Sequence, residues 1–484
     1  MSHFELLTFS ESSLYDCLSN RYAPASAIAL CKQPKYLFRY IEHLKGKFIV
    51  VEPEYIDGDY LEDFASYYVS CFERYDSHCK RLHFFSSKLN LKEFQRAFER
   101  FIVDPKSRGS QLKGSYLGFV VVRPLPEAVV GRTLLKTYPW KKDRDYPAVR
   151  KYRVSLFGRR LGIETLPYQQ QDTVIAACAT VALWSAFHKT NELFNTPNPR
   201  PARITNAANT VRAIGRALPS HDLNTGQMCE AVRAVGLEPQ MEEVGDETPL
   251  LSIIYGHLRY GIPPILLVSL ELKGEWVDHA LTVTGYSIGN GNPKVAEKPL
   301  RHVHSVASRI EEIYVHDDNV GPFSRLFLER MPVPPKGCPR APFAFRGKDP
   351  DGKPETLFVP TSVLLPVYPK IRVTFSEMHS WPQRLMRLLV SYGLPSDTLE
   401  WDIHLVDTAE AMAIYVAGEY QGYRTRLFFE SPIKMRNGFE PATTLVMLLG
   451  RPMYAASIQD VPATLPPHQA ITAHLERYRG TEWK

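Results

Sequence analysis

Apolar residues recur every three or four positions in two stretches of the first third of the chain. This spacing places them on one face of a helix, and it predicts helices over 60–75 and 91–103. The stretch 115–126 is instead a run of β-branched residues closed by prolines, which predicts a buried strand. Residues 1–160 therefore mix helical and strand patterns, and we expect an α+β domain of unknown role there.

The pattern changes after residue 160, where helices come first and strands follow. Apolar spacing predicts a helix over 178–194, a helix and then a strand within 223–239, and a helix over 246–261. Apolar runs then predict strands over 263–272, 279–288 and 312–321. Helices followed by an antiparallel sheet form an α+β arrangement, so residues 161–330 are expected to be a second domain.

The last third of the chain begins with prolines and turn signals. Residues 331–370 contain KDPDGKP and many further prolines, which predict a connection. Residues 371–484 contain the helical stretch SWPQRLMRLLVSYG and three strand-like stretches, EWDIHLVD, AMAIYVAGEY and TRLFFES. They predict a small carboxy-terminal α+β domain. The length of 484 residues agrees with about three domains.

The composition is that of a globular protein, with 44% hydrophobic and 23% charged residues. A net charge of +6 is small for this length and gives no general reason to expect nucleic-acid binding. No run approaches about 18 apolar residues, so no membrane association is expected. The seven cysteines are scattered, and we see no secretory signal, which predicts a cytoplasmic protein with free thiols. We expect neither a cofactor nor a bound metal.

One basic stretch departs from this even composition. From Arg132 to Arg160 there are ten basic residues and two acidic ones, with tyrosines and a tryptophan among them. Such a stretch either binds an acidic partner or is a solvated basic connector. Charge runs usually lie on a solvated surface, so the connector is the more frequent case.

Candidate chemistry gathers in the middle domain. Cys178 stands where a polar loop turns into an apolar helix, and the free N–H groups of a helix start favour the thiolate. His279 lies near the start of the predicted strand in VDHALTVTGY (277–286). The turn VHDDN, which follows a third strand, offers Asp317 or Asp318 to orient an imidazole. A thiol, an imidazole and a carboxylate are the groups that nucleophilic acyl transfer requires.

Acyl transfer also needs hydrogen-bond donors for the developing oxyanion. Gln169, Gln170 and Gln171 stand shortly before the cysteine and offer side-chain amides, and the backbone N–H of Cys178 would be a second donor. The segment 289–312 interrupts the predicted strands, and we interpret it as an insertion that could cover the site.

A weaker candidate lies in the first domain. Cys79 and His83 are four residues apart, which is the spacing of two zinc ligands on one helix face, and Cys71 and His78 are nearby in the sequence. Ordinary packing is the more frequent explanation of such a pair.

The residues around the three middle-domain positions resemble those of papain-like cysteine peptidases. VDHALTVTGY is similar to their histidine strand, and QQQDTVIAACATVALW is similar to their glutamine, loop, cysteine and buried helix. IYVHDDNVG is similar to the strand and turn that present their third catalytic residue. Together with GIPPILLVSL before the histidine, this order most resembles the C39-like peptidases, over residues 161–330.

The resemblance implies a fold in which a helical part packs on an antiparallel sheet, here flanked by two further α+β domains. It also implies Cys178 as nucleophile, His279 as base and acid, and Asp317 as the residue that orients the ring. Asp317 is preferred to Asp318 because it directly follows the strand. Gln171 is the implied oxyanion donor, although the family's glutamine usually lies six residues before the cysteine, where this chain has Asp172. Ala179 also departs from the family, in which Trp or Gly often follows the cysteine.

The function that follows is a cysteine peptidase acting on a protein or peptide substrate. The same residues would serve a deamidase, a transglutaminase or an acyltransferase, because the acyl-thioester intermediate is shared. A third hypothesis is an inert papain-like domain that acts as a scaffold or sensor. A peptidase in the cytoplasm must also spare its host, so we expect that a regulatory protein partner or a cleavage controls it.

Overall fold

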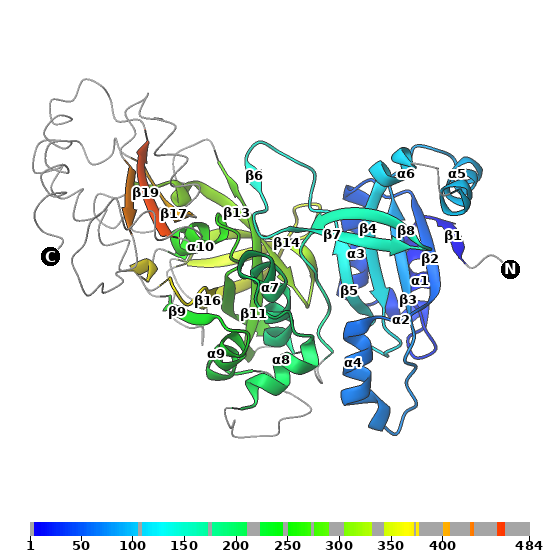
Figure 1. Cartoon of the computed structure of the whole chain (residues 1–484), viewed down its shortest axis with the longest axis horizontal. Helices are drawn as coiled ribbons and strands as arrows, with labels where there is room; N and C mark the ends of the chain where they lie inside the picture. Colours follow the sequence, from blue (N-terminus) through cyan, green and yellow to red (C-terminus); the bar gives the residue numbers. More distant parts are fainter. Residues whose placement is uncertain are drawn as a thin grey trace, which may run out of the picture.

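The computed structural model describes three parts of the chain, which follow one another along the long axis of the molecule (Figure 1). They are an amino-terminal unit, a middle unit and a carboxy-terminal sheet. The described residues are 4–104, 109–172, 177–210, 223–244, 250–272, 275–289, 304–331, 343–371, 374–376, 400–406, 426–429 and 453–459. The described helices include none that is long and apolar enough to cross a membrane. Helices and antiparallel sheets occur together, as the predicted α+β class requires.

The amino-terminal unit is a five-stranded antiparallel sheet in which the strands pair in chain order. The strands are β1 (Glu5–Thr8), β2 (Phe48–Tyr55), β3 (Cys79–Phe85), β4 (Tyr116–Val122) and β5 (Val130–Leu135). The helices are α1 (Glu11–Leu18), α2 (Ala25–Ile28), α3 (Lys32–His43), α4 (Gly58–Ser66), η1 (Tyr68–Ser70), α5 (Leu91–Val103) and α6 (Ser110–Ser115).

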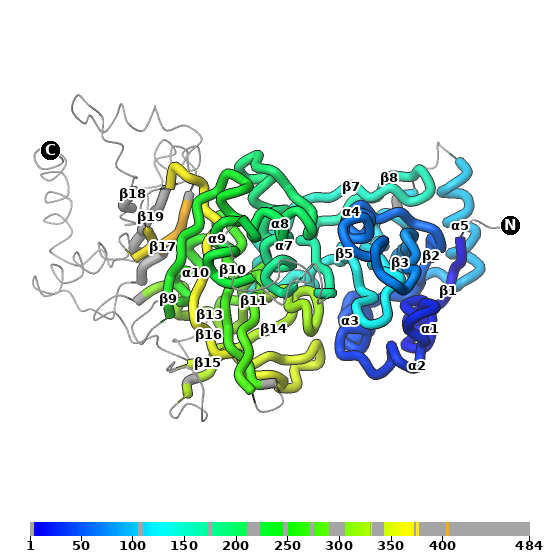
Figure 2. The backbone as a smooth tube through the Cα atoms, turned by 90° about the horizontal axis from the view of Figure 1, so that it is seen from below, coloured from blue at the N-terminus to red at the C-terminus, as the bar shows by residue number. Residues whose placement is uncertain are grey.

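Both faces of this sheet are buried because its strands carry apolar residues at successive positions. Ile49 and Val51 of β2 pack with α1 and α3, whereas Phe48 and Val50 pack with α4 and α5 on the opposite face. The hairpin of β7 (Arg150–Leu156) and β8 (Arg159–Thr165) covers part of that second face and leads toward the middle unit (Figure 2).

Two of the amino-terminal helical predictions have different outcomes. The helix over 91–103 is confirmed as α5, which Asn90 and Glu93 begin with a reciprocal capping box. The helix predicted over 60–75 is too long, because α4 ends at Ser66 and only a short 3-10 turn follows. The predicted strand over 115–126 is present as β4.

The middle unit joins a helical layer to a long antiparallel sheet. The helices are α7 (Cys178–Phe194), α8 (Pro201–Ala208), α9 (Thr225–Ala234) and α10 (Leu250–Leu258). The strands are β6 (Arg144–Asp145), β9 (Glu238–Glu243), β10 (Ile265–Leu272), β11 (Glu275–Ile288), β13 (Ile310–Asp317), β14 (Gly321–Arg330), β15 (Phe343–Lys348) and β16 (Pro354–Val367). The helix predicted over 178–194 and the predicted strands of this region are therefore confirmed, with small shifts at their ends.

The sheet closes on itself because β10 pairs with β11 on one side and with β16 on the other. The closing strand lies in 331–370, which the proline content had predicted to be a connection. Pro360 is accommodated beside Val268, where the register of β10 and β16 shifts by a bulge. Pro354, Pro360 and Pro366 therefore lie within β16, and this strand completes the sheet of the middle unit.

The carboxy-terminal sheet has the strand order β12-β17-β19-β18. Its strands are β12 (His304–Ser305), β17 (Glu400–Val406), β18 (Arg426–Phe429) and β19 (Met453–Gln459). The predicted strands in EWDIHLVD and TRLFFES are present as β17 and β18, and β19 was not predicted. The predicted helix over 380–393 and strand over 411–420 lie outside the described residues. So does most of the insertion predicted over 289–312, whose described end forms β12 and the 3-10 turn η2 (Val306–Arg309).

The amino-terminal and middle units share one apolar core. Tyr314, Val320 and Phe323, from β13, β14 and the turn between them, belong to the same buried cluster as α1 and α3. The Tyr36 hydroxyl of α3 donates to the Pro322 carbonyl at 3.0 Å. A side chain at Gly321 would collide with the Tyr36 ring, so this close approach requires a glycine.

Gly321→Ala should therefore destabilise the protein by about 1–3 kcal/mol, because the added methyl group must push α3 away from the turn. The measurement is urea unfolding of the full chain. Gly162→Ala is the matched control, since a methyl group there meets no atom within 4 Å. Equal stabilities of the two variants would contradict this close packing.

Candidate active site

Cys178 is the first residue of the buried helix α7. Its N-cap, Ala177, has an extended backbone and a side chain that cannot accept a hydrogen bond. The N–H groups of the first turn and the positive end of the helix dipole therefore lie next to the thiol. The Thr282 hydroxyl of β11 donates to the Ala182 carbonyl at 3.0 Å, which fixes the start of α7 against the strand that carries the histidine.

His279 lies on β11, in a part of the strand that extends beyond its pairing with β13. The β11–β13 ladder ends at Thr282 and His316, so the preceding residues of β11 lie beside the turn after β13. On its other edge, His279 pairs with Val268 of β10. The sheet register therefore brings the imidazole to the turn that contains Asp317 and Asp318.

The imidazole contacts both carboxylates and the thiol. His279 Nε2 lies 3.0 Å from Asp317 Oδ1 and 3.4 Å from Asp318 Oδ1. The Cys178 thiol is also hydrogen-bonded to the ring. His279 is 5% exposed and the two carboxylates 1% and 2%, so water screens these charges little. The three residues singled out from the sequence thus lie together.

Asn319 links the predicted glutamine to this group. The Gln171 amide donates to Asn319 Oδ1 at 3.0 Å, and Asn319 Nδ2 lies 3.5 Å from His279 Nε2. The Asn319 backbone N–H donates to Asp317 Oδ1 at 3.0 Å, which orients that carboxylate. Sequence reasoning missed Asn319, although it directly follows the two aspartates in VHDDN.

The surroundings favour a charged imidazole. Burial alone would lower the pKa of His279, but the negative charge of Asp318 and the hydrogen bonds to Asp317 and Cys178 raise it well above its ordinary value. A positively charged ring next to a thiol at a helix start is the arrangement that holds a thiolate.

The other two glutamines have different surroundings. Gln170 accepts from the Val130 N–H at 3.2 Å and donates to the Glu127 carbonyl, so its amide belongs to the amino-terminal unit. Gln169 is buried, and its Nε2 has no acceptor among the residues that the structure describes. The position where the family has glutamine, Asp172, accepts instead from the Tyr68 hydroxyl at 3.0 Å.

The zinc candidate in the amino-terminal unit is wrong. Cys79 and His83 lie on strand β3, where a separation of four residues is roughly 13 Å and too far for a shared ion. The His83 ring instead contacts Tyr116 and Glu52. Within the described ranges, His279, Asp317 and Asp318 are the one set of three such side chains with ligand atoms close together, within 4.8 Å. Hydrogen bonding and charge attraction already account for that set.

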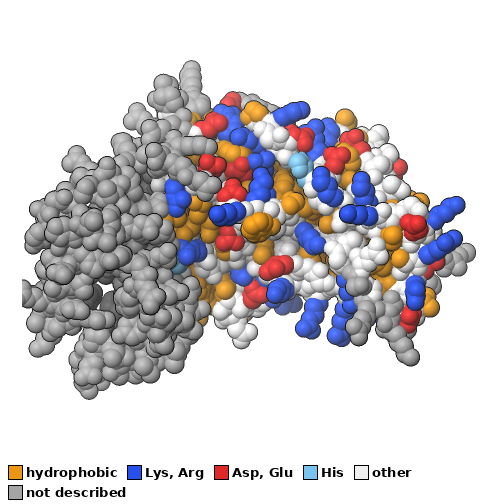
Figure 3. Space-filling model, turned by 90° about the horizontal axis from the view of Figure 1, so that it is seen from above, with side chains coloured by type: hydrophobic (Ala, Val, Ile, Leu, Met, Phe, Trp, Pro, Cys, Tyr) orange, Lys and Arg blue, Asp and Glu red, His pale blue; other side chains and the backbone are white. Residues whose placement is uncertain are grey.

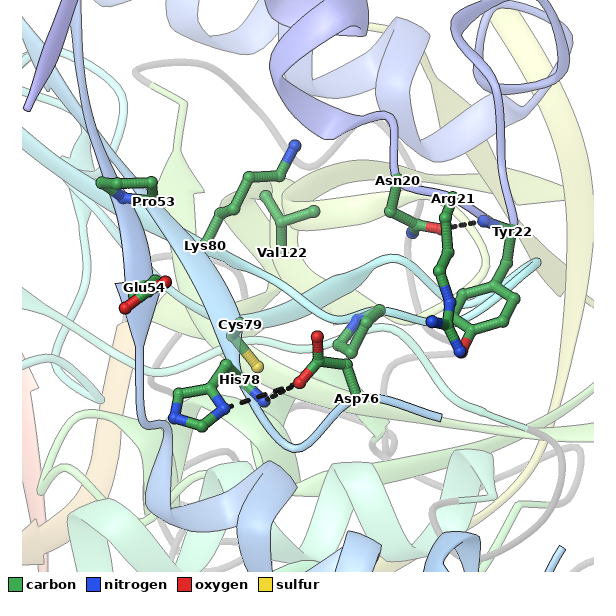
Figure 4. A pocket seen from close by; sticks show the side chains of 11 residues that line it. Asn20, Arg21, Tyr22, Pro53, Glu54, Asp76, His78, Cys79, Lys80 and Val122 are labelled. Carbon is green, nitrogen blue, oxygen red and sulfur yellow. Dashed lines mark hydrogen bonds and ion pairs between the residues drawn. The ribbon is translucent and has the colours of Figure 1, made fainter. Parts of the chain in front are cut away.

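A pocket of about 380 Å³ lies near the start of β3, away from Cys178 (Figure 4). It is lined by Asn20, Arg21, Tyr22, Pro53, Glu54, Asp76, His78, Cys79, Lys80, Val122 and Pro124. Burial raises the pKa of the Cys79 thiol, and this disfavours a reactive thiolate there.

The basic stretch 132–160 is used partly inside the protein, whereas five of its ten basic residues, Lys141, Lys142, Lys151, Arg153 and Arg160, are exposed. Arg132 pairs with Asp57 at 2.7 Å, Arg144 donates to the Tyr314 hydroxyl at 2.7 Å, and Arg150 donates to the His188 carbonyl. Figure 3 shows Lys and Arg spread over one face of the molecule with Asp and Glu among them. The stretch also supplies β6, β7 and parts of β5 and β8, so it is more than a connector, and the acidic partner stays a prediction.

No protein-family model, curated protein or solved structure matches this chain.

The raised pKa of His279 predicts a pH-dependent contribution to stability. The contribution is complete below the ordinary histidine pKa of 6.5 and is lost as pH rises through the raised folded-state value. The difference in unfolding free energy between wild type and His279→Asn should thus be largest at about pH 6 and below, and shrink as pH rises into the alkaline range. Urea unfolding across this range measures it. A difference that grows with pH would contradict a charged imidazole.

Proposed function

We propose that this protein is a cysteine peptidase that hydrolyses a peptide bond in a protein or peptide substrate. The observation that carries the proposal is the His279 ring, which is hydrogen-bonded to both the Cys178 thiol and the Asp317 carboxylate. Thiol, base and orienting carboxylate in that order are what acyl transfer needs.

The closed antiparallel sheet and the buried helix that begins at Cys178 support a papain-like architecture for the middle unit. The C39-like resemblance, which rests on sequence features of 161–330, adds to this support. The cysteine begins the central helix, and the histidine strand and the aspartate turn come from the sheet, as that family requires.

The proposed mechanism uses each group in turn. His279 takes the proton of the Cys178 thiol, and the thiolate attacks the carbonyl carbon of the substrate. The imidazolium then gives its proton to the departing amine as the peptide bond breaks, which leaves an acyl-thioester on the cysteine. His279 next removes a proton from water, the resulting hydroxide attacks the thioester, and the proton returns to the thiol as the acid product leaves. Asp317 keeps the ring aligned throughout.

The oxyanion needs donors, and we assign them to the Cys178 backbone N–H and the Gln171 amide. Gln171 is favoured because its amide already lies in the hydrogen-bonded group around His279. Gln169 is the second candidate, because its buried amide has no acceptor among the described residues.

A thiol-directed warhead should label Cys178 in the wild-type chain, and Cys178→Ala should abolish this labelling. His279→Ala should reduce the labelling rate and lower kcat about 10²-fold to 10⁴-fold, because the thiol loses its base. Intact-mass spectrometry measures the labelling. Cys229→Ala is the control, since Cys229 is a half-buried thiol on α9 and should not affect the rate. Equal labelling of all these proteins would exclude the proposed site.

The products decide between a peptidase and other acyl-transfer enzymes. We expect new peptide termini when the full chain is incubated with a library of denatured proteins and the mixture is sequenced by mass spectrometry. Conversion of Gln to Glu without cleavage, or a new isopeptide bond, would show a deamidase or a transglutaminase instead. Cys178→Ala should give no product of either kind.

Gln171→Ala should lower kcat about 10²-fold to 10³-fold while the rate of Cys178 alkylation stays the same, because only peptide hydrolysis develops an oxyanion. Gln170→Ala is the control, because its amide serves the amino-terminal unit. If Gln169→Ala has this effect and Gln171→Ala does not, the donor is Gln169.

A further inference from the structure

Two carboxylates face one nitrogen of the His279 ring. Nε2 carries a single hydrogen, and the shorter of the two distances, 3.0 Å, is to Asp317. Asp318 Oδ1 lies 3.4 Å from the same nitrogen. Because the Nε2 hydrogen is donated to Asp317, Asp318 interacts with the ring mainly through its negative charge. The two neighbouring aspartates therefore have different roles.

We propose that Asp318 is a positioning residue whose negative charge keeps the His279 ring protonated, separately from Asp317, which sets the orientation of the ring. This inference rests on the proposed thiol site. It assigns Asp318 a role of its own where the sequence had suggested a choice between the two aspartates.

The fold holds Asp318 in place from two directions. Gln33 Nε2 of α3 lies 3.4 Å from the Asp318 backbone carbonyl. The hydroxyl of Tyr168, the residue before the glutamine run, lies 3.4 Å from the same carbonyl. The Asp317 carbonyl accepts from the Val320 N–H at 2.9 Å and closes the turn. At 2% exposure the Asp318 carboxylate can neither swing into solvent nor be screened by it.

The other titratable groups around the ring leave this role to Asp318. Cys178 faces it from α7 and Asp317 from β13, and Tyr168 reaches the same turn only through the Asp318 carbonyl. His316 bonds the Leu166 carbonyl and the Phe323 N–H with its two nitrogens, so it does not face the ring. Asp278 is adjacent in sequence but exposed, and its carboxylate accepts from Ser269 at 2.9 Å.

A second carboxylate matters for the proton that the ring must keep. The imidazolium must keep its proton until the amide nitrogen departs. A nearby negative charge stabilises the protonated ring and so keeps it protonated up to a higher pH. The large contribution of Asp318 to the raised pKa of His279 agrees with this geometry.

The test compares two alkylating reagents of similar shape, iodoacetate and iodoacetamide. Each forms a bond between sulfur and carbon as iodide leaves, so both report the thiolate. A positively charged ring attracts only the anionic reagent, and the ratio of the two rates therefore falls as His279 loses its proton. The full chain is used, and mass spectrometry follows modification of Cys178.

In wild type we expect a ratio that falls only at alkaline pH. Asp318→Asn should move this fall down by about one pH unit or more, which corresponds to a tenfold change in the proton affinity of the ring. Asp318→Glu keeps the negative charge, so its curve should lie close to that of wild type. Asp278→Asn is the matched control and should follow the wild-type curve. Thermal unfolding checks that each variant is folded, and Asp318→Ser replaces Asp318→Asn if the latter is not.

A curve for Asp318→Asn or Asp318→Ser that coincides with wild type overturns the inference. So does a wild-type thiol with no preference for iodoacetate at any pH, which would remove the proposed peptidase site as well. A normal reagent ratio in a protein that cleaves no peptide has a different meaning. In that case the peptidase proposal fails, but the role of Asp318 is still tested. A downward shift of the curve in Asp318→Asn supports it, and an unchanged curve contradicts it.

Discussion

A positive charge held out of water is the constraint on which the arrangement of this molecule depends. The His279 ring is nearly fully buried, so its proton is stable only while carboxylates stay within hydrogen-bonding distance. Those carboxylates lie at a tight turn, and a short turn makes few internal hydrogen bonds that could hold it in one conformation. The ladder of β11 and β13, helix α3 and the Tyr168 segment all fix this turn from outside.

The closed sheet also keeps His279 in position, through contacts between segments that are far apart in the sequence. The strand that carries His279 pairs with β10, and β10 is held on its other edge by β16, about ninety residues further along the chain. Because neither long edge of β10 is open, β11 cannot slide, and a slip by one residue would turn His279 to the opposite face. Strand β16 thus fixes the register of the histidine strand through β10, without contributing a residue to the site.

Sequence patterns were informative where local physics decides the structure. Helices α5 and α7 have a clear apolar pattern, and Cys178 could be placed at a helix start for that reason. The failures arise where distant contacts override the local pattern. Prolines in 331–370 signal a connection locally, but Pro360 is admitted to the sheet where the register of β10 and β16 shifts by a bulge. Cys79 and His83 have helical spacing but lie on a strand, because their neighbours fill both faces of a sheet.

In the candidate site, too, some residues could be predicted from local sequence patterns and others could not. Thiol, imidazole and carboxylate could be named from the sequence, because each stands at the boundary of a helix or strand. The roles of Asn319 and the second carboxylate could not, since they depend on which atoms of one short turn face the ring. Spacing in a sequence does not contain that information.

The apolar core shared by α3 and the β13–β14 turn has a consequence for how this chain can vary. A domain joined by a flexible linker can be exchanged for another during evolution, as cassettes are in modular enzymes. Here the ring of Tyr36 fills the space that Gly321 leaves open, and both belong to one packed interior. Neither unit can therefore be exchanged alone without leaving part of this interior unfilled, and a larger side chain at Gly321 requires a smaller one at Tyr36.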